Sequence, residues 1–131
     1  MRVLGELNFN FEAVGSEAGG IIKNGRYQVY VPEADHHHST THTLAKDGAD
    51  VSIAMGGITT ANFIHVKAVF DDDTVANATI ELVVNDGGGV KTLTGTEFML
   101  VNTDITSILL TNNSHDTTGS DAKVFIDVAG D

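Results

Sequence analysis

Apolar and polar residues alternate along most of this chain, with the period of two that a half-buried strand requires. The clearest example is the stretch from Gly48 to Phe70, around which we expect the rest of the chain to be organised. Its alternating apolar residues are Val51, Ile53 and Met55 before Gly56-Gly57, and Ile64, Val66, Ala68 and Phe70 after it. This pattern predicts two short strands joined through glycine.

The N-terminal third shows the same alternation, interrupted by a glycine-containing loop and a turn. Residues 3–11 predict one long first strand with an aromatic edge at Phe9 and Phe11. Residues 12–20 contain three glycines and no periodicity, so they predict a loop or a mobile arm. Asn24-Gly25 is a strong hairpin signal, because both residues of such a turn adopt positive φ, and it predicts a tight turn between 21–23 and 26–31.

Further strands are predicted towards the C-terminus. The predicted strands are 79–85, 90–93, two short strands on either side of Asn102-Thr103-Asp104, and a last strand that contains Val124, Ile126 and Val128. A glycine-rich turn at 86–89 and a polar loop at 112–121 separate them. In total, eight or nine short strands indicate an all-β protein, a single-domain antiparallel β-sandwich that we expect to be a jelly roll.

The chain length agrees with one domain. At 131 residues the protein can bury about two-thirds of the surface that its unfolded chain exposes. We expect residues 1–20 to form an N-terminal strand and arm, and residues 21–131 to form the β-sandwich.

The segment 33–43 contains most of the histidines, and it is too polar to fill a core. It therefore predicts a surface loop. Imidazoles suit Zn, Ni or Cu, and His36 and His38 could share an ion because alternate residues of an extended chain point the same way. His42 lies close by, but the segment offers no complete ligand shell. A solvated polar loop is the main interpretation, a metal site or a symmetric histidine cluster is the alternative, and no metal ligand is assigned.

Two other stretches invite ligand-binding interpretations. Residues 71–73 are three aspartates, and Asn77 follows them. Their carboxylate and amide oxygens are ligands that suit calcium. However, the order of ligands in an EF-hand loop and its final glutamate are missing. A charged turn that ends a strand is the better interpretation. The glycines at 87–89 could suggest phosphate binding, but no helix start or P-loop pattern follows them, so we expect a turn.

No pattern of catalytic residues is recognisable. Acidic residues are plentiful, but no spacing shows two carboxylates held across a cleft, and no nucleophile-elbow pattern occurs. We therefore expect no enzyme, no catalytic residue and no cofactor. The chain has no Trp, two Tyr and six Phe, which is a weak set of aromatic platforms for a carbohydrate-binding surface.

The charge limits the range of partners. With 18 acidic and 7 basic residues, the formal charge of −11 would repel a nucleic-acid backbone. The N-terminal residues lack the pattern of a signal peptide, and no window approaches the roughly 18 apolar residues of a membrane span. The chain also has no cysteine, so it contains no disulfide framework. Neither nucleic acid nor a membrane is an expected partner.

Several stretches of the chain resemble a group of small virion proteins of tailed bacteriophages. These stretches are 43–45 (TLA), 48–53 (GADVSI), 57–61 (GITTA), 64–67 (IHVK), 97–100 (EFML) and 123–130 (KVFIDVAG). The resemblance extends over about two-thirds of the chain and consists of strand and turn residues. The histidine-rich segment and the loop at 71–78 depart from it.

The resemblance implies a non-enzymatic structural protein of the particle, with a small β-sandwich fold. A capsid decoration (cement) protein, or a head-fibre protein, is the expected role, with the major capsid protein as its partner. It also implies a homo-oligomer, for which a trimer is favoured, on the outer surface of a capsid after synthesis in the host cytoplasm. A tail or fibre adaptor and a carbohydrate-binding β-sandwich module are the alternatives.

Overall fold

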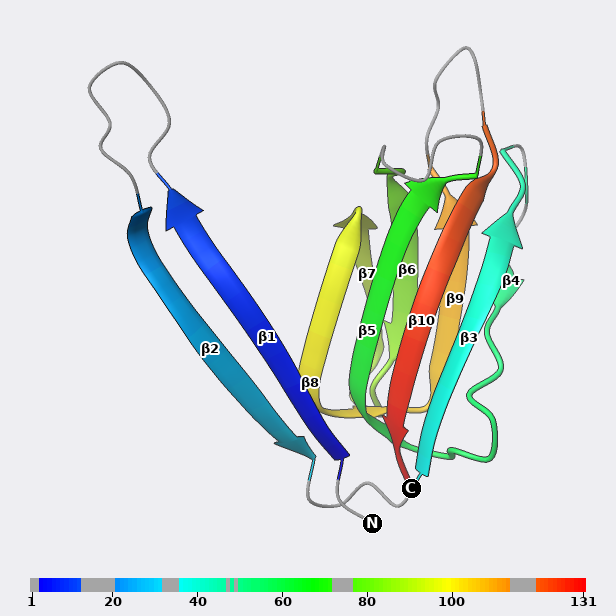
Figure 1. Cartoon of the computed structure of the whole chain (residues 1–131). Helices are drawn as coiled ribbons and strands as arrows, with labels where there is room; N and C mark the ends of the chain where they lie inside the picture. Colours follow the sequence, from blue (N-terminus) through cyan, green and yellow to red (C-terminus); the bar gives the residue numbers. More distant parts are fainter. Residues whose placement is uncertain are drawn as a thin grey trace.

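The computed structural model describes residues 3–12, 21–31, 36–46, 48, 50–71, 77–113 and 120–131. For 3–12, 21–31 and Asn102 the description covers the backbone alone. Across these residues the protein is all-β: two four-stranded antiparallel sheets pack face to face, and a separate two-stranded hairpin precedes them (Figure 1). The predicted β-sandwich is therefore confirmed.

The strand order is that of a jelly roll. The first sheet contains, in spatial order, β3 (His36–Leu44), β10 (Ala122–Gly130), β5 (Ala61–Phe70) and β8 (Glu97–Ile105). The second sheet contains β4 (Val51–Ser52), β9 (Ser107–Asn112), β6 (Ile80–Asn85) and β7 (Val90–Gly95). The strands pair in a nested way, β3 with β10, β4 with β9, β5 with β8 and β6 with β7. A long antiparallel ribbon that is rolled up across two sheets gives this pattern, which defines the jelly roll.

The core lies between the two sheets and follows the alternation of the sequence. The largest fully buried side chains are Leu44, Ile64, Val66, Ile80, Leu82, Ile105, Ile108, Leu110, Val124, Ile126 and Val128. They come from both sheets and form one cluster. Because each such side chain contributes about 1.5–3 kcal/mol when it is removed from water, this cluster is the main source of stability.

The stretch 48–70 forms two strands, as predicted, but these strands lie in opposite sheets. The first, β4, is only two residues long, and Ile53 continues its pairing through one hydrogen bond from its N–H to the carbonyl of Ile108 (3.0 Å). Gly56 then takes a positive φ of 62°, which glycine adopts without strain. The segment between β4 and β5 therefore carries the chain from one sheet to the other.

The N-terminal hairpin consists of β1 (Val3–Glu12) and β2 (Ile21–Val31), which pair with each other and with neither sheet of the sandwich (Figure 1). The predicted turn at Asn24-Gly25 was wrong, because β2 runs through both residues. In the hairpin register Asn24 lies opposite Asn10 and Gly25 opposite Phe9. The long ladder offered by β1 therefore outweighs the local turn preference. The loop predicted at 12–20 begins one residue too early, because Glu12 still belongs to β1, and residues 13–20 lie outside the described residues.

The predicted loop at 33–43 was also wrong over most of its length, because β3 begins at His36. The strand pairs with β10 along its whole length. It is an edge strand, so its side chains need not be apolar, and its three threonines favour an extended backbone. Similarly, β8 continues through the predicted break at 102–104, where its register with β5 shifts.

Candidate functional site

The outer face of the first sheet carries a continuous set of polar and aromatic side chains. Along β10, the even-numbered residues point into the core, so Phe125 and Asp127 lie on the outer face. The register places Asp127 between Ser39 on β3 and His65 on β5. Four residues from four neighbouring strands therefore line up across the sheet, because His65 in turn lies opposite Met99 on β8.

A row of four ionisable side chains, which we call the charged row, crosses this face. Its members are His37, Asp127, His65 and Glu97. The Nε2 of His65 lies 2.8 Å from Oε1 of Glu97, and its Nδ1 lies 3.8 Å from Oδ2 of Asp127. On the other side, Nε2 of His37 lies 3.4 Å from Oδ1 of Asp127, which also accepts a hydrogen bond from the Ser39 hydroxyl. The side chains of His65 and Asp127 are 31% and 40% exposed, so water and salt screen these contacts.

The geometry of this row differs from that of a catalytic triad. In a triad, one ring nitrogen of histidine faces the nucleophile and the other faces the acid. Here Ser39 Oγ (3.3 Å) and Asp127 Oδ1 both face the same nitrogen of His37. Both nitrogens of His65 face carboxylates, which leaves neither directed at a hydroxyl. The arrangement therefore links polar side chains across the outer face without the geometry of a triad.

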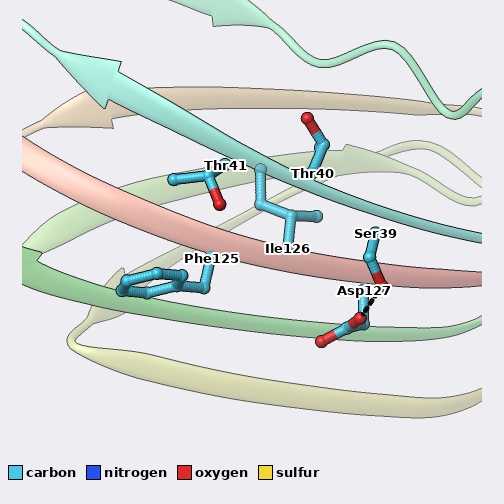
Figure 2. Close-up of a pocket in the computed structure, with 6 residues that line it drawn as sticks. All are labelled: Ser39, Thr40, Thr41, Phe125, Ile126 and Asp127. Atoms are coloured by element: carbon cyan, nitrogen blue, oxygen red, sulfur yellow. Dashed lines mark hydrogen bonds between the residues drawn. The ribbon is translucent and has the colours of Figure 1, made fainter.

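Next to the charged row lies an open hollow of about 450 Å³ (Figure 2). It is lined by Ser39, Thr40, Thr41, Phe125, Ile126 and Asp127. Phe125 is 39% exposed and Met99, two strands away, is 38% exposed, so the face combines charge with apolar surface. The Nζ of Lys123 lies 5.7 Å from the centre of the Phe125 ring, within range of a cation–π contact. A mixed surface of this kind suits docking to another macromolecule.

The histidines of 36–42 lie on β3, where alternation divides them between two faces. His36, His38 and His42 share one face, as predicted for the first two, and His37 lies on the other. The ring of His38 packs so closely against Gly56 that a Cβ there would approach it to 2.7 Å. Among the side chains that the structure describes, no group of three His, Cys, Asp or Glu is arranged to hold a metal ion.

The other predicted ligand stretches have simple structural roles where they are described. The glycines at 87–89 form a turn in which Gly87 and Gly89 have φ angles of 76° and 135°. The N–H of Gly88 donates to the carboxylate of Asp86, which also receives a hydrogen bond from Lys91 and has its pKa lowered by both, chiefly by Lys91. Asp72 and Asp73, part of the calcium alternative, lie outside the described residues.

The sequence patterns did not identify the charged row on the outer face. His65, Glu97 and Asp127 come from three separate strands and match no motif. The available signal was that each occupies a polar position in an alternating strand. That signal indicates exposure, but it does not indicate which strands are neighbours.

Within the described ranges there is no helix of the length and apolar character needed to cross a membrane. Comparison with protein-family models, curated proteins and solved structures found no match to this chain.

Proposed function

We propose that this chain is a non-enzymatic structural protein of a tailed-bacteriophage virion, and specifically a capsid decoration (cement) protein that binds the major capsid protein. The observation that carries the proposal is the outer face of the first sheet, where Phe125 and Met99 are exposed beside the row of charged side chains. The jelly-roll topology supports it, because domains of viral capsids commonly have this architecture. The sequence resemblance described above supports it independently.

Such a protein would act by stabilising contacts between neighbouring capsomers. A face with two half-exposed apolar side chains and solvent-screened ion pairs provides modest affinity for a single copy. An oligomer that binds several capsomers at once gains avidity without any new contact. A trimer on a local threefold axis satisfies this requirement with closed symmetry, and it is the assembly that we propose.

The proposal is tested on particles of the phage that encodes this chain. A decoration protein occurs in numbers comparable to the major capsid protein, whereas a tail or fibre adaptor occurs in few copies, and quantitative mass spectrometry of purified particles distinguishes them. Particles that lack the protein should also bind the purified chain in a sedimentation assay. Phe125→Asp should weaken that binding, and Lys46→Ala, a change in a turn outside the first sheet, should not. Absence of the chain from the particles would refute the proposal.

A carbohydrate-binding module is the second candidate, and the hollow beside Phe125 is the observation that favours it. Its lining combines an aromatic ring with the hydroxyls of Ser39 and Thr41, which could contact the apolar and polar sides of a sugar. A glycan array probed with the assembled protein tests this candidate. Binding that is lost in Phe125→Ala would favour it over a capsid role, and an array without signal would exclude it for the glycans tested.

A further inference from the structure

We propose that the β1–β2 hairpin of one copy adds to the open edge of β8 in a second copy, so that β1 extends the first sheet of its neighbour. This contact is independent of the virion role proposed above. It uses two features of the chain, a hairpin outside both sheets and a strand, β8, that ends its sheet.

The first feature is the edge of β8, the end strand of its sheet. The N–H of Ala68 donates to the carbonyl of Thr96 (2.9 Å), which fixes the alternation of the β5–β8 ladder. In an antiparallel pair every second residue directs its N–H and C=O away from the partner. Counting from Thr96, these residues are Glu97, Met99 and Val101. Their backbone groups therefore face the open side of the sheet.

The central part of this edge lacks the usual protection against pairing. Exposed edges are normally protected by lysine, proline, a β-bulge or a short strand length, and the register shift of β8 lies beyond its central residues, between Val101 and Ile105. The central residues of β8, 98–101, are Phe-Met-Leu-Val. By contrast, β4 is only two residues long, β7 carries Lys91, and β3 is composed mainly of histidine, serine and threonine. Among the described edges of the sandwich, that of β8 is the best template for another strand.

The second feature is the hairpin itself. Isolated two-stranded hairpins are marginally stable in water, and the alternation in 3–11 predicts an apolar face that needs a cover. Of its two strands, β2 carries Lys23 and Arg26, whereas β1 has no lysine, arginine or proline. The lengths also match, with ten residues in β1 and nine in β8.

Charge favours the hairpin as the element that approaches another copy. Its two strands contain two acids, Glu6 and Glu12, and two bases, Lys23 and Arg26, so their formal charge is zero. The whole chain carries −11. Two acidic sandwiches repel each other, but a neutral hairpin can extend from one to the other without that cost.

The length of the connection to β3 excludes the same contact within one copy. Val31 and His36 are joined by five Cα–Cα steps, which reach about 18 Å at most when fully extended. If β1 paired with β8 of its own chain, β2 would lie five strand spacings from β3, which is about 24 Å. The connection between β2 and β3 is therefore too short for the hairpin to pair with β8 of its own copy in this way. In the proposed contact, a second copy provides the β8 edge.

The first test is the mass of the full-length protein in solution, measured by light scattering. The wild-type chain should be an oligomer. Met99→Pro removes one outward N–H while leaving the ladder to β5 intact, so it should reduce the oligomer to monomer. Met99→Ala keeps that N–H and serves as the matched control, which should retain the wild-type mass. A monomeric wild type, or a mass that Met99→Pro does not change in a folded protein, would overturn the proposal.

A second test remains informative if Met99→Pro fails to fold. The chain has no cysteine, so Asn8→Cys and Met99→Cys can be placed in two separate chains, one of which carries a mass tag. After mixing and oxidation with diamide, a disulfide between the two different chains requires that β1 of one copy meets β8 of another. Lys91→Cys in place of Met99→Cys is the control and should give no such product. Glu6→Cys and Asn10→Cys, at the alternate positions of β1 on either side of Asn8, replace Asn8→Cys in parallel mixtures, because they cover the neighbouring registers. Failure of all three to form the product with Met99→Cys, or equal yield with the control, would refute the contact.

Discussion

His65 and Glu97 form the shortest contact between ionisable side chains of the charged row, with 2.8 Å between imidazole Nε2 and carboxylate Oε1, although 32 residues separate them in the sequence. The pair is diagonal across two strands, because the register places Glu97 opposite Lys67 and His65 opposite Met99. It links β8, the open edge of the sheet, to the charged row of its outer face. The contact therefore exists only because β5 and β8 are neighbours.

We expect this ion pair to contribute little to stability. A double-mutant cycle with His65→Gln and Glu97→Gln should give a coupling free energy of about 0.2–1 kcal/mol in urea unfolding, as exposed pairs do. The coupling should fall in about 1 M salt, where the screening length is about 3 Å. The control cycle pairs His65→Gln with Asp104→Asn, an exposed acid at the far end of β8, and should show no coupling. A large, salt-independent value for His65 and Glu97 would contradict this prediction.

Shortening a core side chain should have a much larger effect. Leu82 and Leu110 are directly opposite each other in the second sheet, and both are fully buried. Leu82→Ala should lower the free energy of unfolding by about 2–5 kcal/mol, because it removes buried methyl groups and leaves a cavity. Phe125→Ala, at a half-exposed ring, is the matched control in urea unfolding and should cost less than half as much. Equal losses would show that the outer face is buried in solution.

The chain end contains a position that accommodates glycine alone. A Cβ at Gly130 would lie 1.9 Å from the carbonyl oxygen of Thr60, which itself accepts the N–H of Asp131 (3.1 Å). Gly130→Ala should therefore displace the backbone and lower the free energy of unfolding by about 1–3 kcal/mol or more. Gly57 has no atom within 4 Å of an added Cβ, and Gly57→Ala should change stability by less than about 1 kcal/mol. Similar thermal unfolding curves for the two variants would contradict this expectation.

The turn at 86–89 predicts a specific effect of pH. The hydrogen bond from Lys91, with that from the N–H of Gly88, holds the pKa of Asp86 below its ordinary value of 3.8. Lys91→Met should raise that pKa, which a carboxyl carbon titration by NMR measures directly. Because a lowered pKa contributes stability above the ordinary value and loses it as pH falls through the folded value, any advantage of the wild type over Lys91→Met should shrink below pH 3.8. An unchanged pKa in the variant would refute the role of Lys91.

The strands with a clear period of two were predictable from the sequence. The alternation in 64–70 and in 124–128 predicted β5 and β10, together with the face of each strand that is buried. The errors occurred where local preference and tertiary pairing disagree. Asn24-Gly25 favours a turn, but the ladder with β1 keeps it extended. The polar segment at 36–43 cannot fill a core, but at a sheet edge it needs only a partner for its backbone.

The candidate site could be predicted to a smaller extent. The sequence placed His65 on a polar position of its strand, but the contacts of this residue come from β8 and β10. The histidines at 36–42, which the sequence offered as possible metal ligands, are divided between two faces by the alternation of β3. Of these histidines, only His37 joins the charged row. Residue type indicated which side chains could be charged, but the order of the strands determined which of them meet.

The sequence by itself determined that this protein is built from short strands with one apolar side, because alternation is a local property that the backbone dihedrals impose on every strand. The tertiary structure decided the nested pairing of β3 with β10, β4 with β9, β5 with β8 and β6 with β7. It also decided which polar side chains share the outer face and which edges stay open. These features depend on partners that are far apart along the chain, and the joint burial of all the apolar faces selects among the possible pairings.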